Sequence, residues 1–381
     1  MTRIFTYNSP EAINLKRLLD DFRNSDRLLT LFTALSALFG AMLIVSLQRA
    51  GTYNYLRPQL IAAAIGTAAA FVTAQADYRI MVRKWYFFAI AAAVLAGSVF
   101  LFGMRVSGTD DTAWVSLPFG ITIQPSEFIK PCFIITFTRH LSVLKRKSIL
   151  NKPWAVLSLL LHAAVPVAVI HLQGDDGTAL VFGLVFVIMS VFGGIKLRYF
   201  AALGGAAAAG LPFVWHYLMN ESQRNRLLAL FDSGSTAMAD YAYQQYQGRL
   251  SLANGGAYGA GWFHGQRVAA GIVPEQENDF ILTVAGEELG FIGCIAIMAL
   301  LFTVMLLIIL NSKNALTNEG SLLCAGAFAV IAAQTALNMG MVLGILPVIG
   351  VTLPLFSAGG SSLIGTLICI GLVQSVRIHR Y

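Results

Sequence analysis

Long apolar runs constrain the fold of this chain more than any other feature of its sequence. We identify ten, at about 28–48, 59–76, 85–103, 126–144, 154–172, 178–195, 199–219, 280–310, 320–341 and 359–377. Each is close to the roughly 20 residues that an α-helix needs to cross a bilayer. Hydrophobic residues make up 57% of the chain and charged residues 12%, which excludes a soluble domain. The sequence therefore predicts an all-α polytopic membrane protein with about ten transmembrane helices in a single domain over residues 28–377.

The basic residues predict the orientation of these spans. If residues 1–27 form a cytoplasmic segment and the spans alternate, the short outside loops hold only Arg49, Arg57 and Arg105, and most other Lys and Arg fall inside. This positive-inside bias places both termini in the cytoplasm. The net charge of +7 follows from basic loops facing anionic lipid, so we expect no nucleic-acid partner.

One connection is much longer than the others. Residues 220–279 separate the seventh and eighth runs and fall on the outside by the same alternation. A connection of this length is usually functional or disordered. Its aromatic residues, such as Tyr243, Tyr246 and Trp262, argue against disorder. We therefore expect a large, ordered extracytoplasmic loop that acts as a lid.

Acidic residues gather where this loop meets the eighth run. The stretch PEQENDFILTVAGEELG places Glu275, Glu277 and Asp279 at the boundary, and Glu287 and Glu288 inside the run. A carboxylate in hydrocarbon is costly and rare, so such a pair is a functional-site hypothesis. In the alternative interpretation, Asp279 only caps the helix and the two glutamates pair with a buried cation.

A second informative stretch, WVSLPFGITIQPSEFIK, covers residues 114–130. Trp114 suits a membrane interface, and Ser126 can cap the helix that follows. Glu127 and Lys130 stand three residues apart on one helix face. They either neutralise each other or keep a cation near the outer leaflet for a pyrophosphate.

We also expect Lys130 to reach Glu287 or Glu288 within the membrane. An unpaired charge at that depth costs around 3 kcal/mol on insertion scales, so pairing is favoured. Such a pair would hold the fourth and eighth spans together beneath Asp279.

Two further stretches interrupt the apolar sequence. QGDDGT, at residues 173–178, is a turn with two acids. NMGMVLGILPVIGVTLPLFSAGGSS, at residues 338–362, has several Pro and Gly residues inside an apolar context. Irregular backbone at membrane depth is tolerated where it is buried in protein or lines a cavity.

Five motifs occur in a fixed order: WVSLP…QPSEFIK, QGDDGTA, YQQYQ…NGG, PEQENDF…GEELG and LPVIGVTLPLFSAGGSS. Together they resemble the SEDS family of RodA, FtsW and SpoVE proteins, over about residues 114–362. Each motif is weak alone, but the ordered set is specific. The patterns PEQ-x-x-DF and GVTLP are closer to the RodA branch.

This resemblance implies a peptidoglycan glycosyltransferase of the bacterial plasma membrane, active in cell elongation or division. Such proteins polymerise lipid II into an undecaprenyl-diphosphate-linked glycan and work with a class B penicillin-binding protein, a transpeptidase. The family's catalytic Asp corresponds to Asp279, and its functional Trp and Gln-x-Asp turn correspond to Trp114, Gln173 and Asp175. Further candidates for substrate binding are Gln124, Ser126, Glu127, Lys130, Gln244, Gln247, Arg249, Glu275, Glu288 and Ser361.

The implied reaction joins a sugar hydroxyl to a sugar carried on a lipid diphosphate. A hydroxyl is a poor nucleophile, so a general base such as Asp279 should contribute about 10²–10⁴-fold. Glu275 and Glu277 should raise the pKa of this base by like-charge repulsion. The leaving diphosphate needs stabilisation of its charge, either by a divalent cation such as Mg²⁺ or Mn²⁺ or by basic residues. The basic candidates are Lys130, Arg105, Arg224, Arg226, Arg249 and Arg267.

Two departures from the family pattern leave alternatives open. Ala113 stands where members usually have Arg, and Ala260 where they usually have Lys. The loss of two cations favours a scaffold that recruits a penicillin-binding protein. A flippase for lipid-linked sugars is the other alternative, but it needs a hydrophilic path, and the acids of this chain gather on one side.

Overall fold

A computed structural model describes residues 24–50, 55–104, 112–117, 121–231 and 239–380. Each of the ten predicted apolar runs forms a helix: α2 (Arg27–Ala50), α3 (Leu56–Gln75), α5 (Trp85–Phe102), α6 (Pro125–Arg146), α7 (Pro153–Leu172), α8 (Asp176–Gly193), α9 (Leu197–Phe213), α13 (Ile281–Lys313), α14 (Asn318–Val342) and α15 (Gly360–Ile378). In the described ranges, nine of these helices are long and apolar enough to cross a membrane. The tenth, α6, contains Glu127, Lys130 and Arg139. The all-α polytopic fold is thus confirmed.

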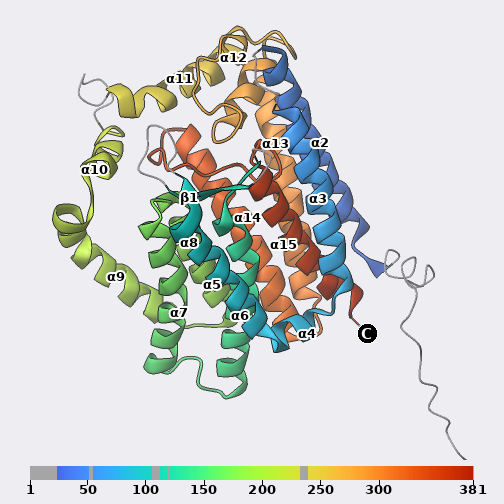
Figure 1. Cartoon of the computed structure of the whole chain (residues 1–381), viewed down its shortest axis with the longest axis vertical. Helices are drawn as coiled ribbons and strands as arrows, with labels where there is room; N and C mark the ends of the chain where they lie inside the picture. The colour runs from blue at the N-terminus through green and yellow to red at the C-terminus, as the bar shows by residue number, and fades with distance from the viewer. Residues whose placement is uncertain (1–23, 51–54, 105–111, 118–120, 232–238, 381) are drawn as a thin grey trace, which may run out of the picture.

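The core lies where α14 and α15 pack against α6, α8 and α13 (Figure 1). Helix α3 runs along α15, and glycines set this close approach. A Cβ at Gly66 of α3 would lie 2.6 Å from the Leu367 side chain, and one at Gly371 of α15 would lie 2.6 Å from the Ala70 carbonyl oxygen. Small residues of this kind let membrane helices approach closely.

Short polar side chains define where several helices begin. Asp77 caps the short helix α4 (Tyr78–Arg83), Asp175 caps α8 and Thr317 caps α14, each accepting a hydrogen bond from a backbone N–H of the first turn. A cap of this type contributes about 1 kcal/mol. These caps fix where the three helices begin, and the cap of α8, Asp175, is itself a candidate functional residue.

A small antiparallel sheet was not predicted. Its strands are β1 (Gly103–Met104), β2 (Trp114–Leu117) and β3 (Ile121–Ile123), with β2 in the centre. Trp114 pairs with Met104 and Val115 with Ile123. The sheet joins α5 to α6 and so positions the start of α6.

The long segment before α13 contains three helices, α10 (Glu221–Leu228), α11 (Ala239–Gly255) and α12 (Gln266–Ala269). The role of the whole segment as an ordered lid stays a prediction. Helix α9 ends in a π-helical turn (Val214–Leu218), and α9 and α10 lie to one side of the bundle (Figure 1). Helices α11 and α12 instead cover the end of α13.

Helix α13 is broken at Gly290, whose backbone has φ 68° and ψ −163°. The break leaves a short first part, 281–289, and a long second part, 291–313. The N–H groups of Phe291 and Ile292 donate to the carbonyl oxygens of Gly256 and Ala257, at 2.9 and 3.2 Å. The loop after α11 therefore takes over hydrogen bonds that a continuous helix would make internally.

Candidate active site

Asp279 lies two residues before α13, at the end of the long segment. The N-cap residue of α13 is Phe280, and no side chain caps this helix. The interpretation of Asp279 as a helix cap is therefore wrong. A Cβ added to Gly350, which has φ +66°, would lie 3.7 Å from Asp279 Oδ2. The glycine thus places no side chain of its own beside the carboxylate.

The backbone around Asp279 is tied to the irregular segment between α14 and α15. The Ala358 N–H donates to the Glu277 carbonyl oxygen at 2.8 Å, and Ser357 Oγ donates to the Asn278 carbonyl oxygen at 2.5 Å. The Pro- and Gly-rich stretch 343–359 has no helix or strand, in agreement with the prediction of irregular backbone. Its function here is to hold the acidic segment in one position.

The surroundings of Asp279 favour a neutral carboxyl. Burial and, to a smaller extent, the charges of Glu275, Asp175 and Glu277 in that order together raise the pKa of Asp279 to about 7. Burial also raises the pKa of Glu277, with Glu275 adding to the effect. The residue Asp279 is still partly accessible, as a base that meets a substrate must be. The predicted repulsion from both glutamates is present, but burial is the larger cause.

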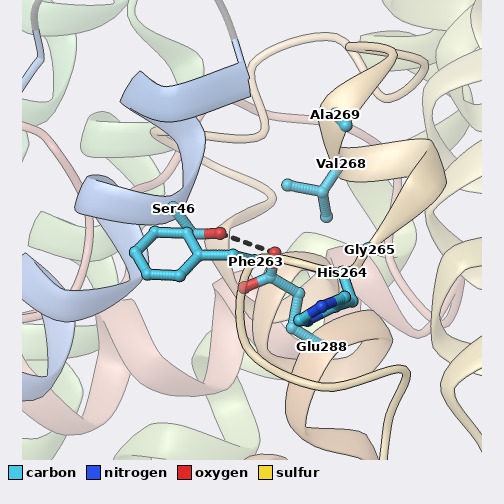
Figure 2. Close-up of a pocket in the computed structure, with 7 residues that line it drawn as sticks. All are labelled: Ser46, Phe263, His264, Gly265, Val268, Ala269 and Glu288. Atoms are coloured by element: carbon cyan, nitrogen blue, oxygen red, sulfur yellow. Dashed lines mark hydrogen bonds between the residues drawn. The ribbon is translucent and has the colours of Figure 1, made fainter.

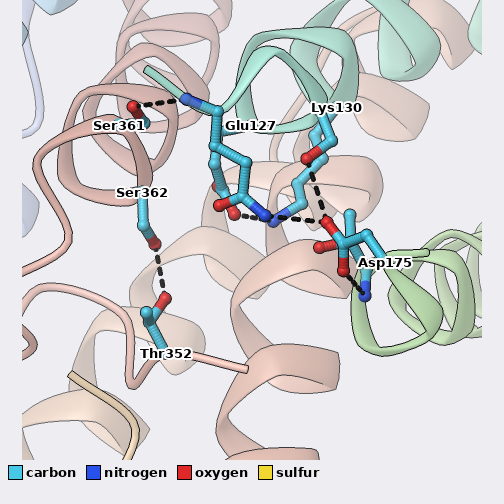
Figure 3. Close-up of polar contacts among 9 residues, drawn as sticks. Glu127, Lys130, Asp175, Thr352, Ser361 and Ser362 are labelled. Atoms are coloured by element: carbon cyan, nitrogen blue, oxygen red, sulfur yellow. Dashed lines mark hydrogen bonds and ion pairs between the residues drawn. The ribbon is translucent and has the colours of Figure 1, made fainter. Parts of the chain in front are cut away.

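Asp175 brings together residues from three helices (Figure 3). Its Oδ2 accepts a hydrogen bond from Gln124 Nε2 at 2.7 Å and one from Ser126 Oγ at 3.4 Å. Its Oδ1 caps α8 through the Thr178 N–H at 2.9 Å. Ser361, at the start of α15, accepts from the Gln124 backbone N–H at 3.0 Å. The QPSE motif, the Gln-x-Asp turn and the double-Ser motif thus form one cluster.

Lys130 pairs with Glu127 on its own helix. The distance from Lys130 Nζ to Glu127 Oε1 is 2.6 Å, and both side chains are almost fully buried (Figure 3). The predicted pairing of Lys130 with Glu287 or Glu288 is wrong, because those carboxylates have other partners. The i, i+3 spacing supplies a nearer carboxylate than any on α13.

Glu287 and Glu288 are held by the long segment and by α2. The Arg267 backbone N–H donates to Glu287 Oε1 at 2.7 Å, and Ser46 Oγ donates to Glu288 Oε1 at 2.5 Å. Glu288 lines a cavity of about 290 Å³ with Ser46, Phe263 and His264 (Figure 2). No basic side chain of the described chain pairs with either glutamate, so the interpretation as partners of a buried cation is also wrong.

The family profile of FtsW, RodA and SpoVE, described as a cell cycle protein, matches residues 26–381. The chain belongs to this family. Family membership confirms the resemblance carried by the five ordered motifs, and it covers the first spans as well as the motif region.

Family members from two branches are equally similar to the chain. The probable peptidoglycan glycosyltransferase FtsW of Geobacter metallireducens is 30% identical, over 96% of this chain and 97% of its own length. The peptidoglycan glycosyltransferase MrdB of Escherichia coli is 30% identical, over 83% of this chain and 84% of its own. Overall sequence identity therefore does not support the prediction that the chain is closer to the RodA branch than to the FtsW branch.

Solved structures of the family share the fold. A peptidoglycan synthase complex, described as coordinating polymerization and crosslinking, matches with a TM-score of 0.79 and 25% identity, over 94% of this chain and 98% of that chain. The crystal structure of RodA from Thermus thermophilus matches with a TM-score of 0.66 and 24% identity, over the same shares. The bundle described above is thus the SEDS fold.

Two of the residues that the family resemblance assigned lie at the edge of the cluster. Gln173 is buried, and its side chain donates to the Ala96 carbonyl oxygen of α5 at 3.0 Å. Trp114 is half-buried on β2, and its indole N–H makes no hydrogen bond with the described residues. Gln173 therefore positions the turn that carries Asp175, whereas the indole N–H of Trp114 is free of the part of the chain that the structure describes.

Of the three candidates on α11, one makes a side-chain hydrogen bond with the described residues and two make none. Gln247 accepts a hydrogen bond from Arg267 Nη2 at 2.5 Å. Gln244 is half-buried and makes no side-chain hydrogen bond with the described residues. Arg249 is exposed and lies beside Gly344, at the end of α14. Glu275 is exposed and accepts from the side chain of Asn278 at 2.8 Å.

Most candidate cations for a diphosphate already have partners. Arg224 donates to the His216 carbonyl oxygen, Arg226 donates to that of Val348, and Arg267 donates to Ser251 and Gln247. Arg249 makes no hydrogen bond or ion pair with the described chain. Arg105 and the acids Asp110 and Asp111 lie outside the described residues. Arg249 is thus the free cation among the five described candidates.

The described residues contain no group of three or more His, Cys, Asp or Glu side chains with the spacing of a metal site. The carboxylates near Asp279 influence it by charge but do not converge on one point. The donor set of the described residues therefore does not fit a bound Mg²⁺ or Mn²⁺.

Sequence reasoning missed three residues that shape the site. Ser46, Asn338 and Ser357 all bond to the acidic segment or to Glu288. Asn338 could have been found, because a lone amide in an apolar run commonly marks an interhelical hydrogen bond. Glu288, the hydrogen-bond partner of Ser46, is 242 residues away in the sequence, so no local sequence pattern indicates this contact.

Proposed function

We propose that the chain is a peptidoglycan glycosyltransferase that polymerises lipid II into glycan strands. The observation that carries the proposal is Asp279, a partly accessible carboxyl whose pKa is raised to about 7, beside Gly350, which places no side chain of its own there. A general base is most effective when its pKa lies near the working pH. Both relatives described above are named as peptidoglycan glycosyltransferases, which supports the same reaction here.

In this mechanism Asp279 accepts the proton of the acceptor sugar hydroxyl. The hydroxyl oxygen forms a bond to the anomeric carbon of the donor sugar, and the bond from that carbon to the diphosphate oxygen breaks. One displacement inverts the anomeric centre. The electron pair leaves with the lipid diphosphate, which needs no strong acid but does need its charge stabilised.

Arg249 is the cation that contacts the diphosphate in this proposal, whereas Lys130 is buried and paired with Glu127. Arg249 is exposed and without a partner among the described residues. Lys130 keeps two further N–H donors beyond the one it gives to Glu127. The cluster of Gln124 and Ser126, at the start of α6, and Asp175, at the start of α8, supplies hydrogen-bonding groups for the sugars.

The proposed setting is the bacterial plasma membrane, with ten spans, both termini in the cytoplasm and the Asp279 end outside. The positive-inside bias of the loops supports this orientation. A class B penicillin-binding protein is the proposed partner. The similarity to a solved complex that coordinates polymerization and crosslinking supports that partner.

The test is polymerisation of lipid II by the purified protein in liposomes, with and without the partner. Asp279→Asn keeps the shape of the side chain and removes the base, so polymer should fall by about 10²–10⁴-fold. Glu221→Gln, an exposed acid-to-amide change at the start of α10, is the matched control and should keep full activity.

The same experiment separates the alternatives. A flippase would move a fluorescent lipid II across the liposome without forming polymer. A scaffold would bind its partner protein and form no polymer. The absence of basic side chains at Ala113, which is buried, and at Ala260 would then explain the missing polymerase activity. Near-normal polymer from Asp279→Asn would rule out Asp279 as the base.

A further inference from the structure

A second cavity lies at the far end of the bundle from Asp279, where α2 begins and α13 and α15 end (Figure 1). It encloses about 360 Å³ and is lined mainly by polar residues from these three helices. The proposed reaction uses none of them. Its basic lining residues are Arg27, from the start of α2, and Arg377, from the last turn of α15.

The cavity favours an anion. Arg377 is half-buried and makes no hydrogen bond or ion pair with any residue in the described ranges. Arg380 donates to the carbonyl oxygen of Asn314, another lining residue, and adds a third positive charge nearby. The positive end of the 24-residue helix α2 points to the same place.

One acid, Asp26, also lines the cavity, but its carboxylate is already engaged. Its Oδ1 accepts a hydrogen bond from the Leu29 N–H at 2.9 Å, and its Oδ2 accepts one from Asn311 Nδ2 at 2.6 Å. These bonds fix Asp26 as the cap of α2. Two arginines thus line the cavity together with one carboxylate, and both oxygens of that carboxylate accept hydrogen bonds.

Apolar side chains at the edge of the cavity select the kind of anion. Leu28 is 56% exposed and Leu310 is 42% exposed, and both line the cavity beside its polar part. A free phosphate ion would gain nothing from them, whereas an amphiphile would bury its chains against them. Basic pockets between transmembrane helices are suited to anionic lipid headgroups.

We propose that this cavity binds the headgroup phosphate of an anionic phospholipid, in the leaflet opposite Asp279. Arg27 and Arg377 contact the phosphate, and the acyl chains lie along Leu28 and Leu310. The site is independent of the proposed glycosyltransferase reaction, so either can fail without the other.

The test is native mass spectrometry of delipidated protein in neutral detergent, titrated with phosphatidylglycerol or phosphatidylcholine. One phosphatidylglycerol should bind in preference to phosphatidylcholine. Arg377→Gln should weaken that binding about fivefold, the effect of one basic residue near a lipid surface. Lys147→Gln removes an exposed charge at the same end of the bundle, outside the cavity, and should leave binding unchanged.

Other outcomes decide against the proposal. Equal binding of the two lipids, or equal weakening by Arg377→Gln and Lys147→Gln, would mean a general surface attraction. Displacement of the lipid by inorganic phosphate at the same concentration would mean a site for the free ion. Arg377→Lys keeps the positive charge and should retain most of the binding. If it does, the loss of binding in Arg377→Gln is due to the lost charge and not to misfolding.

Discussion

Asn338 joins the two backbone segments that form the site around Asp279. Its Nδ2 donates to the main-chain oxygen of Asp279 at 2.8 Å and to that of Val351 at 2.7 Å. The residue is fully buried on α14, and its Oδ1 has no partner. Asn338 therefore serves only as a donor, and it fixes the distance between the segment that carries Asp279 and the loop that carries Gly350.

Replacement of Asn338 by Leu should lower both stability and polymerisation. The change leaves two carbonyl oxygens without their donor, and each buried unsatisfied group costs about 1–3 kcal/mol. Thermal unfolding in detergent and lipid II polymerisation measure the two effects. Gln334→Leu, one turn earlier on α14, removes a buried amide that makes no hydrogen bond with the described residues, so it should be much milder. Equal effects of the two changes would contradict the role of Asn338.

The rate of polymerisation should rise with pH through about 7, because the pKa of Asp279 is raised to about 7 and only the ionised carboxylate accepts a proton. Glu275→Gln removes a like charge and should move this rise to lower pH. Glu221→Gln, on α10, should leave the profile in place. A profile that is the same in the Glu275 variant and the parent would contradict the electrostatic coupling.

The same raised pKa predicts how stability depends on pH. The folded state binds the Asp279 proton more tightly than the unfolded state, whose pKa is near the ordinary 3.8. This contribution is complete below 3.8 and is lost as the pH rises towards about 7. Asp279→Asn should therefore unfold at a higher temperature than the parent at pH above 7, and the difference should shrink in acid.

The buried pair Glu127–Lys130 should show strong coupling in a double-mutant cycle. Removal of one partner leaves an uncompensated buried charge, which costs about 3–5 kcal/mol. Lys130→Met alone should be strongly destabilising, whereas Glu127→Gln with Lys130→Met should recover most of the loss. Thermal unfolding of the parent, the two single variants and the double variant measures the coupling. Additive losses would show that the pair contributes little.

Gly255→Ala should separate α11 from α13. A Cβ at Gly255 would lie 1.9 Å from the Gly286 carbonyl oxygen, so one backbone must move. Overpacking of this kind costs about 1–3 kcal/mol, and it should also reduce activity because the long segment positions Asp279. Gly183→Ala on α8, where an added Cβ meets nothing within 4 Å, is the control. A fully active, stable Gly255→Ala protein would show that this contact is dispensable.

The sequence predicted the helices well because their signal is local: each apolar run has the length of a span. It also predicted that Gln124, Ser126, Asp175 and Ser361 belong to one site, through motifs whose order matches a family. For Lys130 the interpretation as an ion pair with Glu127 is confirmed, whereas the pairing with a glutamate of α13 is wrong, because a carboxylate one turn away is nearer. The contact of Ser46 with Glu288 joins distant parts of the chain and leaves no local trace.

The break at Gly290 also limits how the long segment can move. If Gly256 and Ala257 moved away from α13, the N–H groups of Phe291 and Ile292 would lose their acceptors at the entrance to the hydrocarbon, where an unsatisfied group costs several kcal/mol. The loop after α11 therefore stays hydrogen-bonded to α13. A substrate must enter past another part of the long segment before α13.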